Sequence, residues 1–218
     1  MYQINHVETL PELSKDCPLW ATANELSIDQ FHENSSDHRP LVKAKMVHDN
    51  HSIQVLYMVE DQYLIAKNTE LHSMVCQDSC VEFFVQPDAS YFNFEMNAAG
   101  TLHVCHIKDC TPVETGGFAD MEFLSADDCT KIEICSSLSG PITDEIAEET
   151  SWWLAIRIPA EVLGNYCKVT TPLSGQIWTA NFYKCADNSS HPHWASWNNI
   201  GEQLAFHKPD YFAGISFE

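Results

Sequence analysis

The strongest constraint on the fold lies in residues 77–97, where apolar and polar side chains alternate along two consecutive segments. In the first segment, Val81, Phe83 and Val85 point to one side of an extended chain and Glu82 points to the other. The second segment alternates in the same way, with Phe92, Phe94 and Met96 set against Asn93, Glu95 and Asn97. A period of two predicts neighbouring strands that share one apolar face, which builds a core, and one face of carboxylates and amides.

Similar runs rich in aromatic and β-branched residues recur along the chain between turn-forming clusters. The predicted strands are Val42 to His48, Ser52 to Glu60, Tyr63 to Lys67, Cys80 to Gln86, Tyr91 to Asn97, Thr101 to Ile107, Thr130 to Ser137, Trp152 to Ile158, Ile177 to Cys185 and Tyr211 to Phe217. About ten short strands with hardly any helical period between them favour an all-β fold, an antiparallel sandwich. Residues 2–40 and 187–209 show the least regular pattern.

Two short segments carry turn signals. Residues 97–100 predict a hairpin turn, because Gly100 tolerates the positive φ that a tight reversal often requires. Residues 159–164 predict one helical turn, with proline at its start and glycine at its end. No repeat, low-complexity tract or long linker interrupts the 218 residues, so we expect one domain over 1–218.

The charge balance restricts the partners. The chain has 11 Lys and Arg against 31 Asp and Glu, a formal net charge of −20. Such a surface repels phosphate backbones and anionic lipids, so we expect neither nucleic acid nor a membrane as partner. The oligomeric state is not specified by any pattern.

The cysteines and the N-terminus suggest a compartment. Nine cysteines are scattered without paired C-x-x-C spacing, as is typical of reduced, buried thiols. The first residues have neither a basic start nor an apolar stretch long enough for export, and no run of about 18 apolar residues follows. The sequence as written predicts a cytoplasmic protein; if a leader was removed, it is secreted.

Several polar and aromatic side chains are candidates for ligand contact. Acceptors gathered on one face suit a ligand rich in hydroxyl groups, and a sugar is the first such ligand to consider. Glu82 and Glu95 offer carboxylates on neighbouring strands, and a carboxylate accepts sugar hydroxyls in charge-assisted bonds. Asn97 either joins this face or only holds the hairpin turn. Asn181 alternates with core residues on its own strand, so it is also placed on the non-core face.

Two tryptophans of the irregular segment 187–209 add an apolar component. Trp194 and Trp197 lie in a predicted loop among histidines and asparagines. Indole rings at the end of a sandwich can stack on the apolar faces of pyranose rings. The remaining tryptophans, Trp20, Trp152, Trp153 and Trp178, are predicted to belong to the core.

Beyond single residues, a series of spaced motifs carries a family resemblance. The motif residues are Leu56-Tyr57 and Asp61; Asp78-Ser79, Glu82 and Phe84; Tyr91, Phe94, Asn97 and Gly100; Trp153, Ile156, Ile158 and Pro159; Trp178 and Asn181-Phe182-Tyr183; and Phe206-His207, Pro209, Phe212 and Gly214. Their order and spacing over about residues 40–218 resemble carbohydrate-binding module family 9 and its stand-alone relatives. Any one of these motifs is weak, but the whole series is specific.

The resemblance implies a DOMON-like, immunoglobulin-like β-sandwich that binds mono- and oligosaccharides and is often joined to enzymes that degrade polysaccharides. It implies that a sugar ring stacks between two aromatic side chains while a Glu, an Asn and basic or amide groups hold its hydroxyls. Glu82 matches the motif Glu, and Asn181 lies in the motif Asn-Phe-Tyr. The chain departs from the pattern at Cys76, where a stacking Trp is expected, and at Lys184, where relatives more often have Arg.

Metal binding has weaker signals. The resemblance implies that calcium often supports this fold, and the acidic pairs and runs at Asp127-Asp128 and at 144–149 offer oxygen ligands without the EF-hand pattern. His191-x-His193 and His103-x-x-His106 lack a third ligand at recognisable spacing, which favours hydrogen-bonded histidines over a metal site. Structural calcium is therefore the one cofactor candidate, and the metal ligands are unknown.

Together these features predict a non-catalytic module that binds a neutral saccharide and takes part in polysaccharide catabolism. One alternative is a glycoside hydrolase that uses Glu82 and Glu95, because two suitably spaced carboxylates can cleave glycosides. A second alternative is a haem-binding electron-transfer domain of the DOMON type, with Met96 and His103, or Met74 and His72, as axial ligands.

Overall fold

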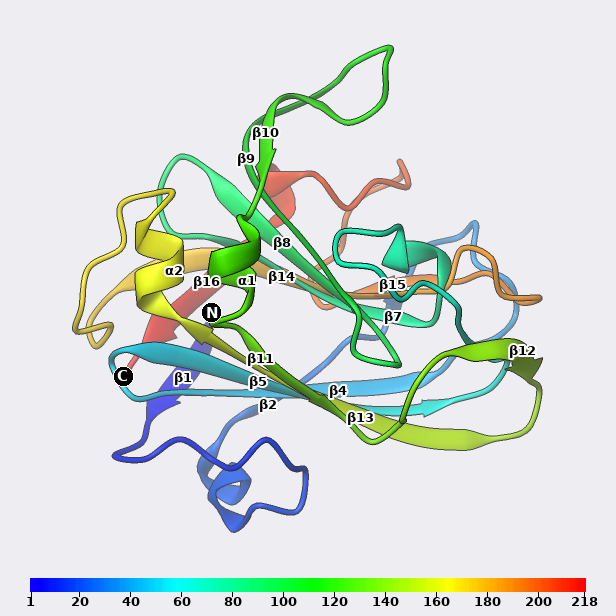
Figure 1. Ribbon diagram of the computed structural model, residues 1–218, viewed down its shortest axis with the longest axis horizontal. Helices are drawn as coiled ribbons and strands as arrows, with labels where there is room; N and C mark the ends of the chain where they lie inside the picture. Colours follow the sequence, from blue (N-terminus) through cyan, green and yellow to red (C-terminus); the bar gives the residue numbers. More distant parts are fainter.

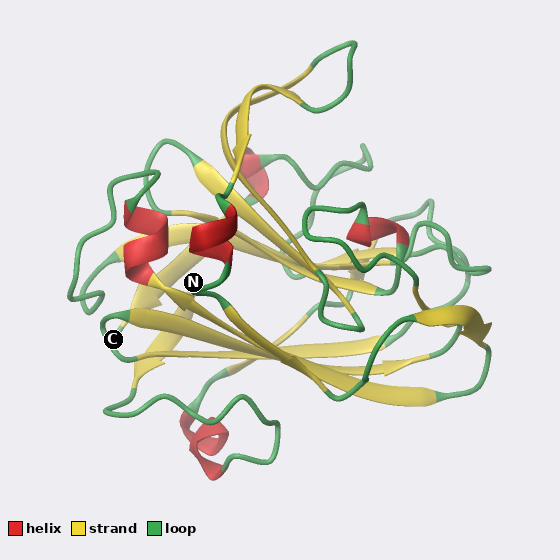
Figure 2. Ribbon diagram, viewed as in Figure 1, coloured by secondary structure: helices red, strands yellow, loops and turns green.

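The computed structural model describes residues 1–218, and most of its regular structure is β (Figures 1 and 2). The strands are β1 (Tyr2–His6), β2 (Glu25–Ser27), β3 (Gln30–Phe31), β4 (Leu41–His48), β5 (Ser52–Asp61), β6 (Leu64–Ala66), β7 (Cys80–Gln86), β8 (Tyr91–Asn97), β9 (Leu102–Pro112), β10 (Phe118–Phe123), β11 (Glu133–Ser136), β12 (Ile142–Ile146), β13 (Thr150–Pro159), β14 (Ile177–Cys185), β15 (Trp194–Ser196) and β16 (Ala213–Phe217). The helical elements are η1 (Pro18–Thr22), η2 (Val75–Gln77), α1 (Ala126–Cys129), α2 (Ala160–Gly164) and η3 (Pro209–Tyr211). None of these helices has the length and apolar character needed to cross a membrane.

Fourteen strands form one curled sheet whose two halves face each other (Figure 1). One half holds β2, β4, β5, β13 and β11, and the other holds β7 to β10 with β14 to β16 and the short β3. Strand β1 joins the halves, because it pairs with β16 on one side and with β4 on the other. The remaining two strands, β6 and β12, pair only with each other.

The prediction of a purely antiparallel sandwich is wrong at β1. This strand runs parallel to both neighbours, with Tyr2 opposite Ile215 and Asn5 opposite Val47. Parallel neighbours need a long connection, and the stretch between His6 and Leu41 supplies it for the pair β1 and β4. The sheet is therefore mixed, and the segment 2–40, predicted to be irregular, contributes three short strands.

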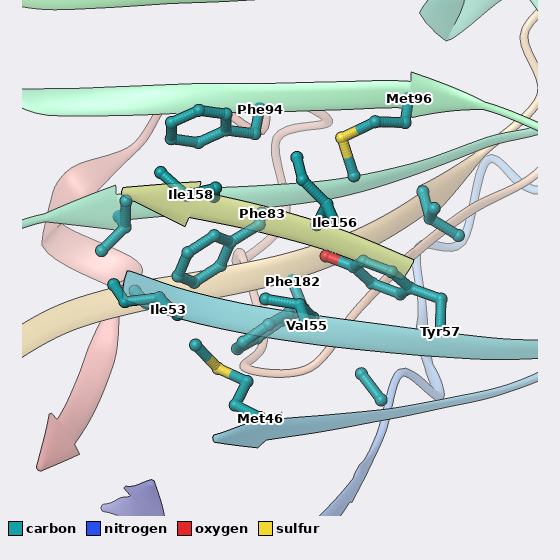
Figure 3. Close-up of a cluster of buried hydrophobic side chains, with 14 of the residues drawn as sticks. Met46, Ile53, Val55, Tyr57, Phe83, Phe94, Met96, Ile156, Ile158 and Phe182 are labelled. Atoms are coloured by element: carbon teal, nitrogen blue, oxygen red, sulfur yellow. The ribbon is translucent and has the colours of Figure 1, made fainter. Parts of the chain in front are cut away.

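The two-faced alternation produces the core that it predicts. Val81, Phe83 and Val85 of β7 and the apolar set of β8 are all buried in one cluster of 39 residues. Figure 3 shows Phe83, Phe94 and Met96 from one half of the sheet facing Ile53, Val55 and Ile156 from the other. Burial of these side chains supplies the main favourable free energy of folding.

Strand bounds agree with the prediction where the alternation is clean. The strands β7, β8 and β14 begin and end at the predicted residues. The predicted strand at Thr130 to Ser137 starts too early, because Ser125 accepts a hydrogen bond from the backbone N–H of Asp128 and caps the short helix α1. Strands β10, β12 and β15 were not predicted, since they lie in short or irregular polar segments.

Both turn predictions are confirmed. Gly100 has a φ of 87°, and its N–H donates to the carbonyl of Asn97 at 2.8 Å. The helical turn forms as α2, which follows Pro159. Three of the tryptophans predicted for the core, Trp20, Trp152 and Trp178, are buried, whereas Trp153 packs half-buried on the outer side of the β4–β5–β13 half.

One buried polar atom in the core leads to a prediction about stability. The hydroxyl of Tyr57 is buried and has no hydrogen-bond partner, although its ring packs beside Phe182. A buried hydroxyl without a partner costs about 1–3 kcal/mol. We expect Tyr57→Phe to increase the free energy of unfolding by about 1 kcal/mol in urea titrations. A loss of stability in this variant would mean that the hydroxyl has a partner in solution.

Candidate functional site

A cleft of about 880 Å³ lies over the outer face of β7, β8 and β9. Its floor comes from these strands and from the end of β14, and its walls come from the β9–β10 hairpin and from loops around residues 74–76, 187–194 and 204–207. The lining residues are Met74, Cys76, Glu82, Phe84, Asn93, Glu95, His103, Cys105, Ile107, Gly116, Gly117, Phe118, Met121, Glu122, Phe123, Cys185, Asp187, Trp194, Leu204, Ala205, Phe206 and His207. In Figure 1 the β9–β10 hairpin projects away from the sheet.

The polar face of the two opening strands is buried rather than open to solvent. Glu82 is 2% exposed, Asn93 2% and Glu95 6%. The alternation predicts which side chains share this face but carries no signal for the loops that cover it. These loops convert a polar sheet surface into a cleft with a desolvated floor.

Two carboxylates dominate that floor. Glu82 and Glu95 lie directly opposite each other on β7 and β8. Burial, and secondly the charge of Glu95, raise the pKa of Glu82 well above its ordinary value. Burial also raises the pKa of Glu95, although the neighbouring His103 and Asn93 oppose this. Like charges in such a position destabilise a fold unless a proton or a ligand separates them.

The hydrogen bonds leave one buried carboxylate oxygen without a donor. The thiol of Cys185 donates to Oε1 of Glu82 at 3.1 Å, whereas Oε2 of Glu82 is buried without any partner. Oε1 of Glu95 accepts from Nδ2 of Asn93 at 2.7 Å, and Oδ1 of Asn93 accepts from the backbone of Cys105. Asn93 is thus fixed in orientation, and Glu82 presents an unused acceptor at the cleft.

Thiols surround Glu82. Cys80 and Cys185 are directly opposite in the β7–β14 pair, and their sulfur atoms lie within 4.8 Å of each other and of a Glu82 oxygen. Burial raises the pKa of the Cys80 thiol to about 12, so it is protonated at neutral pH. Burial raises the pKa of Cys76 as well. The three side chains Cys80, Glu82 and Cys185 are the donor types that suit a thiophilic cation.

Aromatic side chains form the upper walls of the cleft. Trp194 is half-buried, and its Nε1 donates to Oδ1 of Asp187 at 2.7 Å, which fixes the indole plane. Phe206 stacks on Tyr183 with 4.0 Å between ring centroids. Phe123 is 50% exposed at the rim. Trp194 and Phe206 pack against the same small cluster as Cys76, the position where the resemblance implies a stacking tryptophan.

Three of the seven predicted ligand residues line the cleft: Glu82, Glu95 and Trp194. Asn97 does not. It is fully buried, and its Nδ2 donates to Asp78 and to the carbonyl of Asn68, while its Oδ1 accepts from the backbone of Thr101. Its place at the end of β8 makes it a support for the hairpin turn.

Asn181 and Trp197 also lie outside the cleft. Asn181 donates to the carbonyl of Asn198 and accepts from its N–H, so it orders the loop after β15. Trp197 packs against Tyr2 and Phe182 at the edge of the main core. The predicted contact of these two residues with ligand therefore finds no geometric support here.

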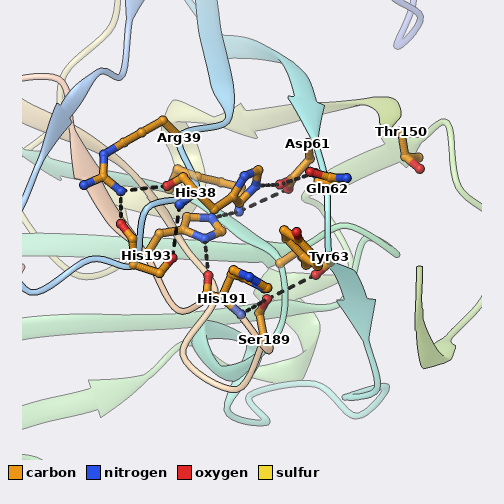
Figure 4. Close-up of polar contacts among 12 residues, drawn as sticks. His38, Arg39, Asp61, Gln62, Tyr63, Thr150, Ser189, His191 and His193 are labelled. Carbon is orange, nitrogen blue, oxygen red and sulfur yellow. Dashed lines mark hydrogen bonds and ion pairs between the residues drawn. The ribbon is translucent and has the colours of Figure 1, made fainter. Parts of the chain in front are cut away.

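Lys184 points to the opposite side of the sheet from Glu82. Its side chain is 0% exposed, and its Nζ lies 3.3 Å from Oδ2 of Asp61 and 2.7 Å from Nε2 of His193. The same Asp61 contacts His38 at 2.8 Å (Figure 4). Lys184 sits one residue away from the cleft-facing positions of β14, and the strand period directs it inward.

This buried network also accounts for His193. His38, Asp61 and His193 bring possible metal ligands together, but the ammonium group of Lys184 already contacts Asp61 and His193. Burial and the charge of Lys184 lower the pKa of His193 to about 3. His191, the other half of the pair, stacks on Tyr63 instead (Figure 4).

The haem alternative meets a geometric obstacle. Met96 is fully buried in the main core, whereas His103 lines the cleft on the other face of the sheet. Nδ1 of His103 donates to the carbonyls of His72 and Ser73. Met96 and His103 therefore face opposite sides and cannot ligate one iron. In the second pair, Met74 lines the cleft and is 53% exposed, but His72 is not among the lining residues.

The acidic segments proposed for calcium have separate roles. Asp128 accepts hydrogen bonds from Ser125, Asn165 and Tyr166 and contacts Lys131. These partners lower its pKa despite the opposing effect of burial. Glu145 accepts from the backbone and the hydroxyl of Ser190.

Several cleft residues were missed by reasoning from the sequence. Asn93 had a signal, because it alternates with Phe92 and Phe94 beside Glu95. Phe206 belongs to one of the motifs but was given no role. His103 was considered only as a metal or haem ligand. Asp187 and Phe123 had no usable signal, since their places depend on how the loops and the β10 strand fold over the sheet.

The comparisons with known proteins agree with this architecture. The profile of "Carbohydrate-binding family 9" matches residues 19–217. No curated protein matches the chain. A protein from Bacteroides uniformis ATCC 8492, provisionally assigned as carbohydrate-binding, has a crystal structure at 2.70 Å resolution that matches with a TM-score of 0.86 and 29% identity, over 99% of this chain and 98% of that one.

Two further structures show the same fold at lower identity. Both are of a family 9 carbohydrate-binding module from Caldicellulosiruptor kristjanssonii, one in complex with glucose and one with cellotriose. Their TM-scores are 0.63 and 0.61 at 16% and 15% identity, covering 99% and 100% of this chain and 95% and 93% of theirs. Because the profile matches nearly the whole sequence, the chain belongs to carbohydrate-binding family 9.

Proposed function

We propose that the cleft over β7, β8 and β9 is the carbohydrate site and that it takes a mono- or oligosaccharide without cleaving it. The observation that carries the proposal is the unpartnered Oε2 of Glu82, buried in a cleft of about 880 Å³. A sugar hydroxyl supplies the donor that this oxygen lacks. Two of the similar structures contain glucose and cellotriose, which supports a ligand of this class.

The aromatic walls suit the apolar faces of a pyranose ring. Trp194 is held in plane by Asp187, and Phe206 is held by Tyr183. Fixed rings lose little conformational entropy when a ligand stacks on them. We therefore assign stacking to Trp194 and Phe206, and hydroxyl contacts to Glu82, Glu95 and Asn93.

Two features disfavour the hydrolase alternative. A glycosidase needs one protonated acid and one ionised carboxylate on either side of the scissile bond. Here Glu82 and Glu95 come from adjacent strands of one sheet face, and the pKa of each is raised. The absence of turnover of aryl glycosides, in the wild type as in Glu82→Gln and Glu95→Gln, is the expected result. If the wild type hydrolysed an aryl glycoside and either variant lost that activity, the proposal of a non-catalytic site would be contradicted.

A binding experiment tests the site directly. Isothermal titration with glucose, cellobiose and longer oligosaccharides, after a glycan screen by thermal shift, should show binding in the millimolar to micromolar range, roughly 4–8 kcal/mol. Glu82→Ala should weaken binding about 10- to 100-fold, because a charge-assisted hydrogen bond contributes about 1.5–3 kcal/mol. Trp194→Ala should weaken it about tenfold. Glu60→Ala, an exposed carboxylate on β5, is the matched control and should change nothing.

The outcomes distinguish this cleft from other parts of the molecule. If no saccharide binds, the proposed function fails. If Lys184→Met or Asn181→Ala abolishes binding in a folded protein while Glu82→Ala does not, the site lies elsewhere than in this cleft.

Three finer statements stay predictions beside this proposal. The first is that the fold is of the DOMON type, and the second is that calcium supports it. The third is a reducing compartment, which the nine free cysteines support. A thiol titration that finds nine reactive thiols in the denatured, freshly purified protein is the expected result.

A further inference from the structure

The cleft contains several acidic groups but no lysine or arginine. Glu82, Glu95, Glu122 and Asp187 line it, and its only nitrogen bases are His103 and His207. Of the four carboxylates, Glu122 is already paired with Lys108 at 2.9 Å. The other three have no cationic partner within ion-pair distance.

These three carboxylates act on one another. Asp187 and Glu95 both raise the pKa of Glu82, and Asp187 raises that of Glu95. The ammonium group of Lys184 lies on the core side and contacts Asp61 and His193. Lys184 lowers the pKa of Glu82 and His103 lowers that of Glu95, but neither outweighs the effect of burial, and no ion pair in this chain holds these carboxylates in their ionised form.

A second observation points to a ligand. Oε2 of Glu82 is buried and has no hydrogen-bond donor, although Glu82 is 2% exposed and lines the cleft. A neutral hydroxyl can donate to this oxygen but does not offset the repulsion between the ionised forms of Glu82 and Glu95, which raises the pKa of Glu82. A cationic donor satisfies the oxygen and offsets the charge at once, which is the stronger type of hydrogen bond.

We propose that the preferred ligand carries an ammonium group, namely an amino sugar of the glucosamine type whose nitrogen lies between Glu82 and Glu95. This inference rests on the proposed carbohydrate function and replaces the expectation of a neutral saccharide. The pyranose ring stacks on the aromatic wall as before, and the amino substituent reaches the floor. N-acetylation removes the charge and adds bulk, so it abolishes the preference.

The test compares ligands with the same β-1,4-linked backbone. Isothermal titration at pH 6.5 and 0.15 M NaCl uses the glucosamine disaccharide, cellobiose and N,N′-diacetylchitobiose. We expect the glucosamine disaccharide to bind about tenfold more tightly than cellobiose, and the diacetylated disaccharide to bind no more tightly than cellobiose. In Glu95→Gln the advantage should fall to about twofold, while in Glu60→Gln it should persist.

Each result decides a different point. If cellobiose binds as tightly as the glucosamine disaccharide, the amino-sugar inference is overturned and the carbohydrate function stands. If neither binds, both fail. The tighter binding of the glucosamine disaccharide could also come from the overall charge of −20. In that case Glu60→Gln would reduce it as much as Glu95→Gln does, or 0.5 M NaCl would remove it. Either result overturns the amino-sugar inference.

Titration with CaCl₂ or ZnCl₂ alone separates an amino sugar from a metal as the cation. If either metal binds to the wild type and not to Glu82→Gln, while the glucosamine disaccharide has no advantage, the carboxylates serve a metal and the inference is overturned. Unchanged amino-sugar binding in 2 mM CaCl₂ is the supporting result.

Discussion

Glu82→Gln is expected to make the protein more stable at pH 7–8 while it weakens ligand binding. The pKa of Glu82 is raised well above its ordinary value of 4.5 by burial and by Glu95. In the unfolded chain this carboxyl is ionised at neutral pH, whereas in the fold it must either keep a proton or remain charged beside Glu95. Both options cost free energy that an uncharged glutamine avoids.

The sign of the pH dependence follows from the raised pKa. The folded protein holds more protons than the unfolded chain between pH 4.5 and the pKa of the folded state, so stability due to Glu82 is complete below about pH 4.5 and is lost as the pH rises. We therefore expect Glu82→Gln to increase the free energy of unfolding by about 1–3 kcal/mol at pH 7–8 and by close to zero at pH 4.5.

Urea titrations across this pH range measure the effect, and Glu60→Gln is the control. A change within about 0.5 kcal/mol is expected for that exposed residue at every pH. A gain for Glu82→Gln that is equal at pH 4.5 and pH 8 would show that the effect is not electrostatic. A stability gain together with a loss of affinity would identify Glu82 as a residue kept for binding at the expense of stability.

Lys184→Met is expected to be the most destabilising single change considered for this protein. The ammonium group and Asp61 are both 0% exposed and lie 3.3 Å apart. Removal of one partner from a buried ion pair costs about 3–5 kcal/mol, because the other charge stays buried. For a chain of this size we expect the melting temperature to fall by roughly 10 °C.

Two variants make this result specific. Lys43→Met breaks an exposed ion pair with Glu25 at 2.7 Å and should cost less than about 1 kcal/mol. The double variant Lys184→Met/Asp61→Asn should recover much of the loss, because no charge is then left unpaired. If Lys184→Met retained full stability and lost sugar affinity, Lys184 would serve the ligand, as its position after the Asn-Phe-Tyr motif suggests.

His193 makes the folding stability depend on pH in the opposite direction to Glu82. The pKa of His193 is lowered to about 3, so the unfolded chain takes up a proton between about pH 6.5 and pH 3 that the folded protein does not. Stability due to His193 is therefore complete above about pH 6.5 and falls on acidification. His193→Gln should flatten this part of the stability profile.

The residues at the site show where a sequence argument works. Glu82 and Glu95 were identified because they interrupt apolar strands at regular alternation, a local property. Asn97, Asn181 and Lys184 were also predicted as ligand contacts, and the structure gives each one a supporting role, to the turn, the loop and the core respectively. A motif match predicts where a residue lies in a strand, but it does not predict which groups its side chain contacts.

The amino-acid sequence was enough to predict the β class, the bounds of β7, β8 and β14, and the division of their side chains between two faces. These features follow from a period of two residues, which acts over neighbouring residues. Only the folded chain shows that β1 joins the two halves of the sheet in parallel and that the polar face lies under loops. It also shows that the ammonium group of Lys184 is paired with the buried carboxylate of Asp61. Such contacts join residues far apart in the chain, and their free energy depends on burial that no local pattern encodes.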